Sequence, residues 1–188
     1  MNRLHRWYCQ SSHWKRTLEH EILPWAMRGV TLGDEVLEIG PGPGLTTDWL
    51  ASRCATLTCI EKDFRLANAL QHRTDGMNVV VKCGDATAMS VPEQSFTSVV
   101  CFTVLHHVPS PHLQDRLFAE VYRVLRSGGV FAGTDSRKSL MMQLFHLHDT
   151  MVLVDPMKLP ARLESAGFTD INVELSSARF RFSARRAA

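Results

Sequence analysis

The chain has 188 residues, of which 45% are hydrophobic and 21% charged, and its formal net charge is +2. This length suits one domain with a substantial core, and the composition is typical of a globular protein. A charge this small gives no argument for nucleic acid as a partner, no apolar run is long enough to span a bilayer, and the N-terminal residues lack the apolar stretch of a secretory signal. We therefore expect a cytoplasmic protein, and the five cysteines, which form no C-x-x-C pair, also favour reduced thiols.

Apolar runs alternate with helical patterns from Glu35 onward, which predicts a parallel sheet covered by helices on both faces. Asp63 and Ser110 are placed to cap the second and third helices, and Ser127 with two glycines to stop the third. The expected strands are 35–40, 55–60, 78–82, 97–104 and 129–134, and the expected helices between them are 44–53, 64–73 and 112–126.

The C-terminal part predicts a different arrangement. After Asp155-Pro156 a further helix is expected to run to Gly167, and two alternating segments, 168–176 and 178–185, then predict an antiparallel hairpin. The whole pattern predicts a single α/β domain over residues 1–188, with a doubly wound, Rossmann-like, seven-stranded sheet and an antiparallel C-terminal hairpin.

Two segments lie outside this plan. Residues 1–33 are expected to form a helical extension, in which Pro24 ends or kinks an amphipathic helix over 11–28. Residues 136–154 suggest a second amphipathic helix, inserted after the fifth strand. Since ligands of open α/β sheets bind beyond the carboxyl ends of the strands, we expect the insertion to roof a ligand site.

A glycine-rich segment, Glu38-Ile39-Gly40-Pro41-Gly42-Pro43-Gly44, follows the first expected strand. Its glycines allow a sharp turn and let a ligand approach the backbone closely. A dinucleotide-binding turn, G-x-G-x-x-G, holds a pyrophosphate through backbone N–H groups, whereas here the third glycine comes one residue early and two prolines remove N–H donors. The segment predicts a ligand without phosphate whose positive charge faces Glu38, such as S-adenosylmethionine; a purely structural strand-to-helix turn is the alternative.

This segment resembles motif I, E/D-x-G-x-G-x-G, of the class I S-adenosylmethionine-dependent methyltransferases. The resemblance extends from about residue 34 to the C-terminus, because the family also has a seven-stranded sheet with a reversed last strand. It implies that Glu38, Gly40, Gly42 and Gly44 bind the cofactor.

The end of the second expected strand carries a candidate for the ribose. Glu61 follows the glycine turn by about twenty residues, where a carboxylate accepts hydrogen bonds from both ribose hydroxyls. Its rival, Asp63, suits a helix cap better, and Lys62 lies between them as a further cofactor-binding candidate.

Two later segments complete the expected cofactor site. Cys83-Gly84-Asp85-Ala86 resembles the next family motif, which implies that Asp85 accepts from the adenine amino group and that the N–H of Ala86 serves the ring. A turn-forming role for Asp85 is the alternative. The backbone around Cys101 and Phe102, at the end of the fourth strand, is implied to meet the methionyl end, with Gly40 and Gly42 on the other side.

Two branches of the family compete for the acceptor. The glycine segment and Ile60-Glu61-Lys62-Asp63 resemble most closely the ribosomal RNA adenine dimethyltransferases, which need an N-P-P-Y type of motif at strand four to hold a flipped base. Residues 101–108 contain no such motif. Phe96–Val100, Leu105-His106-His107-Val108 and Val124–Gly129 resemble instead the small-molecule methyltransferases with F-D-x-V and L-H-H-V, although Thr97 replaces the usual Asp.

The paired histidines supply a candidate catalytic residue. We expect His106 to face the cleft, as general base or as a positioning residue for the acceptor, and His107 to face the protein; a histidine that only packs is the alternative. Trp14 from the N-terminal segment, and His146 and Asp149 from the insertion, are further candidates for contacting the acceptor.

No metal site is expected, because His146 and His148, two positions apart on a helix, do not share a face. Asp135, just past the fifth expected strand, is another polar residue at the ligand edge. The main hypothesis is therefore methyl transfer from S-adenosylmethionine to a small, apolar or aromatic acceptor by in-line displacement, with nucleic acid not expected as a partner. An RNA adenine methyltransferase-like enzyme and a non-catalytic nucleotide-binding module are the alternatives, and the sequence indicates no oligomeric state.

Overall fold

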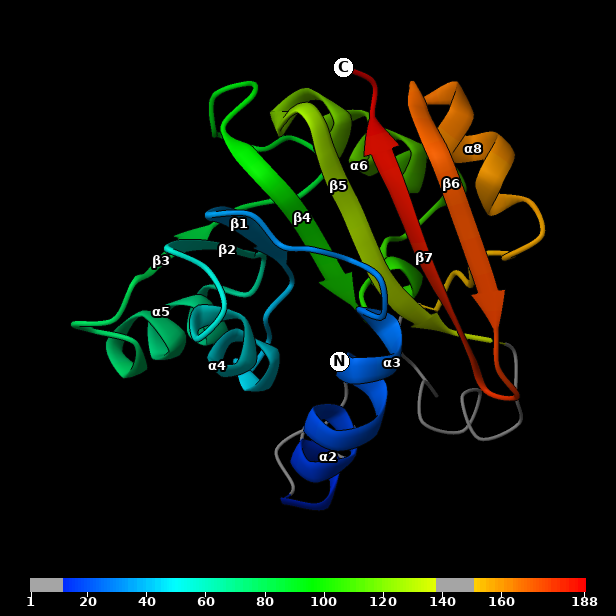
Figure 1. Cartoon of the computed structure of the whole chain (residues 1–188). Helices are drawn as coiled ribbons and strands as arrows, with labels where there is room; N and C mark the ends of the chain where they lie inside the picture. The colour runs from blue at the N-terminus through cyan, green and yellow to red at the C-terminus, as the bar shows by residue number, and fades with distance from the viewer. Residues whose placement is uncertain (1–11, 138–150) are drawn as a thin grey trace.

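The computed structural model describes residues 12–137 and 151–188, which form an α/β fold around a seven-stranded sheet of order β3-β2-β1-β4-β5-β7-β6 (Figure 1). The strands from β1 to β5 pair in parallel, and β7 runs antiparallel to both β5 and β6. The predicted seven-stranded sheet with an antiparallel C-terminal hairpin is thereby confirmed. The strands are β1 Glu35–Ile39, β2 Thr56–Glu61, β3 Val79–Cys83, β4 Phe96–Phe102, β5 Leu125–Ser136, β6 Phe168–Leu175 and β7 Arg179–Arg186.

Helices cover both faces of the sheet. Because side chains alternate along a strand, the neighbouring residues Val36 and Leu37 enter two different cores. Val36 packs in the core under α3, α4 and α5, whereas Leu37 packs in the core under α6 and α8. The described helices are α2 Ser12–Thr17, the π-helix η1 Leu18–Ile22, α3 Leu23–Ala26, α4 Leu45–Ala51, α5 Phe64–Arg73, the 3-10 helix η2 Leu105–His107, α6 Pro111–Val124 and α8 Leu159–Ser165.

The start of α6 agrees with the sequence prediction, but its end does not. Ser110 caps α6 by accepting a hydrogen bond from the backbone N–H of Leu113. The helix ends at Val124, before the expected stop at Ser127, and β5 begins at once because the buried Leu125 pairs with Phe96. The glycines that follow Ser127 lie instead in a register shift of the strand pair.

The N-terminal helix continues through Pro24 rather than ending there. The backbone N–H of Leu23 donates to the carbonyl of Leu18, five residues back. This wider π-turn accommodates the proline, which has no N–H and would clash with a carbonyl in a regular α-helix. In Figure 1, α2 and α3 lie beyond the arrowhead of β4, at the carboxyl edge of the sheet.

Parts of the two expected additional segments, residues 1–11 and 138–150, lie outside the described residues. The insertion leaves the sheet at Arg137, whose N–H donates to Ala178, and returns at Val152, whose N–H donates to the carbonyl of His106 at 2.8 Å. Within residues 12–137 and 151–188, none of the helices has the length and apolarity of a membrane span.

Candidate functional site

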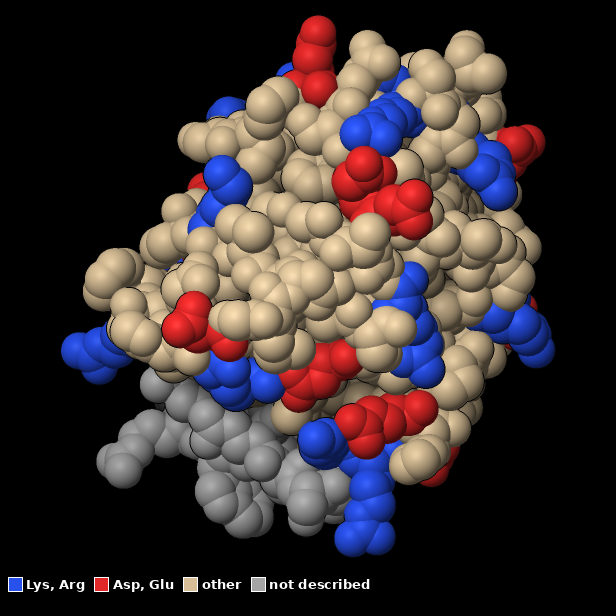
Figure 2. Space-filling model, turned by 60° about the vertical axis from the view of Figure 1, so that its left-hand side comes forward, with Lys and Arg blue, Asp and Glu red and all other residues tan. Residues whose placement is uncertain are grey.

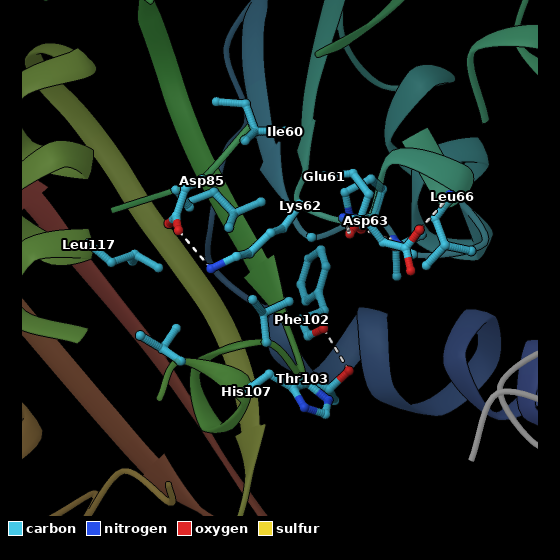
Figure 3. Close-up of a pocket in the computed structure, with 18 of the residues that line it drawn as sticks. Ile60, Glu61, Lys62, Asp63, Leu66, Asp85, Phe102, Thr103, His107 and Leu117 are labelled. Carbon is cyan, nitrogen blue, oxygen red and sulfur yellow. Dashed lines mark hydrogen bonds and ion pairs between the residues drawn. The ribbon is translucent and has the colours of Figure 1, made fainter. Parts of the chain in front are cut away.

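A cavity of about 530 Å³ opens at the carboxyl ends of β1, β2, β3 and β4. Its size lies in the range of small-molecule and cofactor sites, and its position is the one where open α/β sheets bind ligands. Figure 3 shows Asp85 and Leu117 at one end of the cavity, Glu61, Asp63 and Leu66 at another, and Thr103 with His107 below the end of β4. Its wall comprises Gly40–Pro43, Glu61–Asp63, Gly84–Thr87, Phe102–Val104 and His107–Pro109, with Trp14 and Leu18 from the N-terminal helix.

Gly40 and Gly42 line the cavity for different reasons. Both have positive φ, 65° and 56°, which favours glycine. A side chain at Gly40 would come within 2.7 Å of Val104, whereas a Cβ at Gly42 would meet nothing within 4 Å. Gly40 therefore permits close packing, and Gly42 leaves the cavity open to a ligand.

Gly44, which was also expected to bind the cofactor, does not line the cavity. Its φ of 84° is left-handed, and a Cβ there would collide with the side chains of Leu70 and Arg73. The guanidinium of Arg73 also donates to the carbonyl of Gly44 at 2.9 Å. Gly44 thus packs α4 against α5.

Glu38 also lies behind the cavity rather than in it, and this corrects the expectation that its carboxylate faces a ligand's positive charge. The side chain is 1% exposed and accepts hydrogen bonds from the hydroxyls of Thr46 and Thr47, the latter at 2.6 Å. Burial raises the pKa of Glu38 although these hydroxyls lower it. Glu38 therefore ties β1 to the first turn of α4 and holds the glycine segment between them.

Glu61 lines the cavity, 8% exposed, at the end of β2. Its two oxygens accept from the backbone N–H groups of Gly42, at 3.0 Å, and Asp63, at 2.9 Å. Asp63 in turn caps α5 by accepting from the N–H groups of Arg65 and Leu66, as predicted. The carboxylate of Glu61 is therefore fixed at the cavity wall, while that of Asp63 is engaged by the helix.

Asp85 and Lys62 form an ion pair of 2.7 Å in the cavity wall. Asp85 also accepts from the backbone N–H and the hydroxyl of Thr87, at 2.9 and 2.8 Å, so the turn-forming role and the place at the cavity coexist. Partial burial acts to raise the pKa of Asp85, but Lys62 and Thr87 outweigh it and hold this pKa at about 2. Asp85 is thus an ionised acceptor, and Ala86 lies next to it in the wall.

The end of β4 presents Phe102 and Thr103 to the cavity, not Cys101. The side chain of Cys101 is fully buried, and burial raises the pKa of its thiol. Of the two residues whose backbone was expected beside the cofactor, Phe102 lines the cavity and Cys101 does not. Thr103 has a φ of 60°, which is strained for a β-branched residue, and its N–H donates to Thr134 at 2.8 Å. Such strain is concentrated at functional sites, and no sequence pattern indicated it.

The orientations of His106 and His107 are the reverse of those expected from the sequence. His106 is 2% exposed, and its Nδ1 lies 2.5 Å from Oδ1 of Asp135, so it faces the protein. His107 lines the cavity beside Thr103 (Figure 3). The expectation for His106 was wrong because the tight turn of η2 points successive side chains in different directions and the buried Asp135 holds the first of them.

Trp14 lines the cavity from α2, where it packs with Leu18 and Ile22. The guanidinium carbon of Arg179 lies 5.2 Å from the centroid of its ring. His146 and Asp149, the other two expected acceptor contacts, lie outside the described residues. Among the residues that the structure describes, no three His, Cys, Asp or Glu side chains gather in a way that could hold a metal ion.

Comparison with known proteins gives a consistent set of relatives. Residues 37–133 match the family model described as a methyltransferase domain. The chain is 32% identical to the ubiquinone biosynthesis O-methyltransferase of Pseudomonas fluorescens over 88% of this chain and 78% of that protein. The protein of the same name from Pseudomonas putida is 36% identical over 71% of this chain and 59% of its own length.

Solved structures share the fold. An S-adenosylmethionine-dependent methyltransferase from Aquifex aeolicus matches with a TM-score of 0.76 over 98% of each chain, at 17% identity. Phosphoethanolamine N-methyltransferase 2 from Haemonchus contortus, solved with phosphomonomethylethanolamine and S-adenosylhomocysteine, matches with a TM-score of 0.74 over 93% of this chain and 53% of that one, also at 17% identity. At these identities the likeness concerns the fold alone.

Proposed function

The chain belongs to the class I S-adenosylmethionine-dependent methyltransferases, and we propose that it methylates a small-molecule acceptor held beside His107. The observation that carries this proposal is the single cavity wall that joins the glycine segment, the fixed carboxylate of Glu61 and the strained end of β4. The glycine segment and Glu61 suit the binding of the cofactor, and the end of β4 suits the place where the methyl group would be transferred. In this assignment the fold supplies one continuous site for donor and acceptor.

The residues present fit the cofactor. A carboxylate at Glu61 suits two ribose hydroxyls, the ionised Asp85 suits an amino group of adenine, and the open face of Gly42 suits close approach to the backbone. S-adenosylmethionine supplies, when bound, a methyl group on a positively charged sulfur. Gly40 and Phe102 would lie at its methionyl end, and Ala86 would lie at its adenine end.

The acceptor is proposed to be a hydroxyl compound. The relatives are named O-methyltransferases. A hydroxyl group must lose its proton when its oxygen forms a bond to the transferred methyl carbon. His107 is the titratable side chain at the end of β4 that lines the cavity, so we assign it the role of general base. Thr103 and Trp14 would position the acceptor.

The RNA methyltransferase alternative has less support. An RNA adenine methyltransferase-like enzyme needs an N-P-P-Y type of motif after β4, where this chain has Thr103-Val104-Leu105-His106. On the face drawn in Figure 2, basic and acidic side chains are interspersed over a largely uncharged surface. This mixture favours a small acceptor over a nucleic acid.

A cytoplasmic location is part of the proposal, since the four described cysteines are free thiols.

The proposal is tested in two steps with the full chain. Calorimetry first measures the affinities for S-adenosylmethionine and S-adenosylhomocysteine; a lack of binding at micromolar concentrations would contradict the proposal. A screen of phenols, quinones, thiols and amines then follows the release of S-adenosylhomocysteine. Binding without turnover on any acceptor, phenols included, would favour the non-catalytic module.

His107→Gln checks the assigned base. We expect it to keep the cofactor affinity and to lower turnover on a phenol by about 10²-fold, the usual contribution of a general base. The control is His112→Gln, since His112 is exposed on α6 and does not line the cavity. A near-normal rate in His107→Gln would show that the acceptor is oriented without this base.

A further inference from the structure

A buried carboxylate and a buried imidazole stand behind His107. Oδ1 of Asp135 lies 2.5 Å from Nδ1 of His106, and Oδ2 of the same carboxylate accepts from the backbone N–H of His106 at 3.1 Å. Both side chains are buried. One carboxylate of β5 therefore fixes the ring and the backbone of the residue that precedes His107.

The charge state of Asp135 follows from its contacts. Burial by itself would raise its pKa, but His106 and the N–H of Ser136 outweigh burial and lower the pKa below its usual range. An ionised carboxylate only accepts hydrogen bonds, so Nδ1 of His106 carries the hydrogen and donates it. The orientation of the His106 ring is thereby set.

The ring of His106, which Asp135 holds in place, contacts the ring of His107. The two ring centroids are 4.1 Å apart, with the planes inclined by 40°. The turn that carries both residues is tied on either side: the N–H of His107 donates to Val104, and the amide of Gln114 donates to the carbonyl of Leu105 at 3.0 Å. Asp135, His106 and His107 thus form a continuous line from the sheet to the cavity.

We infer that Asp135 and His106 are positioning residues that hold His107 at the acceptor and favour its protonated form. The inference rests on the proposed function. When His107 takes the proton of the acceptor hydroxyl, a positive charge forms on its ring, and the negative charge of Asp135 behind His106 stabilises it at low dielectric. No other reactant is needed, because the proton moves from the acceptor oxygen to the imidazole.

The other charged groups of the cavity lie mainly on its β2 and β3 side. Lys62 and Asp85 pair with each other there, and Glu61 and Asp63 accept from backbone N–H groups. The guanidinium of Arg179 packs on the ring of Trp14, which lines the cavity. These groups are unchanged when only Asp135 is replaced, so a comparison of wild type with Asp135→Asn isolates the contribution of its charge.

The test uses Asp135→Asn and His106→Gln in the full chain. The ring of His107 is followed by NMR in ¹³C-histidine-labelled protein, with His107→Gln to assign its signal. We expect its titration midpoint to move to lower pH by about one unit in Asp135→Asn, because one buried charge has been removed. Asp115→Asn, which removes an exposed acid paired with Arg162, is the control and should leave the midpoint in place.

Turnover provides the second readout. In each variant that keeps the cofactor affinity and the thermal unfolding midpoint of a folded protein, the acid limb of kcat against pH should move with the ring titration, and kcat should fall about tenfold. A His107 midpoint within about 0.2 pH units of wild type in folded Asp135→Asn would overturn the inference. His106→Gln keeps the charge of Asp135 and tests positioning alone, so an unchanged kcat in this variant would also overturn the inference, whether or not Asp135→Asn folds.

The two hypotheses fail separately. The ring titration requires neither cofactor nor acceptor, so an unchanged midpoint would overturn the inference while methyl transfer could still be measured. A shifted midpoint in a protein that binds no S-adenosylmethionine would overturn the proposed function alone. A reduced rate with an unchanged pH profile would show that Asp135 and His106 act only on the folded structure.

Discussion

Gly40, Gly42 and Gly44 all have a left-handed backbone conformation, but they have different structural roles. Gly40 makes room for Val104, Gly44 makes room for the side chains of α5, and Gly42 faces open space in the cavity wall. A sequence motif cannot separate these roles, because it shows only that glycine recurs. The space around each Cα separates them directly, and it singles out Gly42 as the position where ligand access is at stake.

Gly42→Ala tests this distinction. A left-handed alanine costs about 1–2 kcal/mol of stability, so the variant should be destabilised by that amount and should also bind S-adenosylmethionine more weakly. Gly76→Ala is a matched control, since Gly76 also has a positive φ, 77°, and nothing within 4 Å of a Cβ, but it does not line the cavity. Urea unfolding and calorimetry should show equal losses of stability and a loss of affinity only in Gly42→Ala.

Glu61→Ala tests the assigned ribose acceptor. Removal of the carboxylate leaves two hydroxyls without a charged partner, which should weaken cofactor binding by about 1–3 kcal/mol. Glu120→Ala is the control, because Glu120 likewise accepts from a backbone N–H, that of Met89, but lies away from the cavity. An unchanged affinity in Glu61→Ala would transfer the ribose role to Asp63.

Among single residues, the sequence predicted the location of a side chain correctly where position along a strand decides it, and the role of that side chain toward a ligand stays a prediction. Glu61 and Asp85 end or follow parallel strands, so their place at the ligand edge follows from the fold. The orientation of His106 and His107 depends instead on Asp135, which is remote in sequence and buried. No local pattern encodes that contact.

At the scale of elements, α5 starts where its cap predicts, and this offers a test independent of the ligand. Asp63→Ala removes the acceptor for two N–H groups and should cost about 1 kcal/mol of stability, while Asp63→Asn should retain most of it. Ser110→Ala should cost a similar amount at α6. Calorimetry on Asp63→Ala should give a cofactor affinity within about twofold of wild type, because the carboxylate of Asp63 is bound to the backbone of α5 and is not assigned to the cofactor. A tenfold loss of affinity would contradict the assignment of Asp63 as a helix cap only.

Element boundaries show where local signals are overruled. The helix ends before the stop expected at Ser127, and the fully buried Leu125 pairs with Phe96 in the sheet instead of continuing the helix. Thr97, which replaces the acid of the related pattern, exchanges hydrogen bonds with both backbone groups of Glu35 and so joins β1 to β4. In both cases long-range pairing in the sheet decides the local structure, and it is not readable from neighbouring residues.

For the whole molecule, the ionised carboxyl groups set the dependence of stability on pH. The pKa of Asp85 is held at about 2, and those of Glu120, Asp135 and Glu174 are also lowered. Arg123 lowers that of Glu120, and Arg181 lowers that of Glu174. A carboxyl group with a lowered pKa stabilises the folded protein above the pKa of the unfolded chain, and this contribution is lost as the pH falls. Glu38, whose pKa burial raises, contributes in the opposite direction.

Stability should therefore decrease between about pH 4 and pH 2, as these carboxyl groups take up protons in the unfolded chain first. Lys62→Gln sharpens the test, because Lys62 is a main cause of the low pKa of Asp85. This variant should lose less stability than wild type over the same interval, whereas Lys82→Gln, a replacement on β3 outside the cavity wall, should follow wild type. Urea unfolding at several pH values provides the measurement. A wild-type free energy of unfolding that stays constant down to about pH 2.5 would show that the ion pairs do not control acid stability, and equal slopes in Lys62→Gln and wild type would exclude Asp85 as one of the groups responsible.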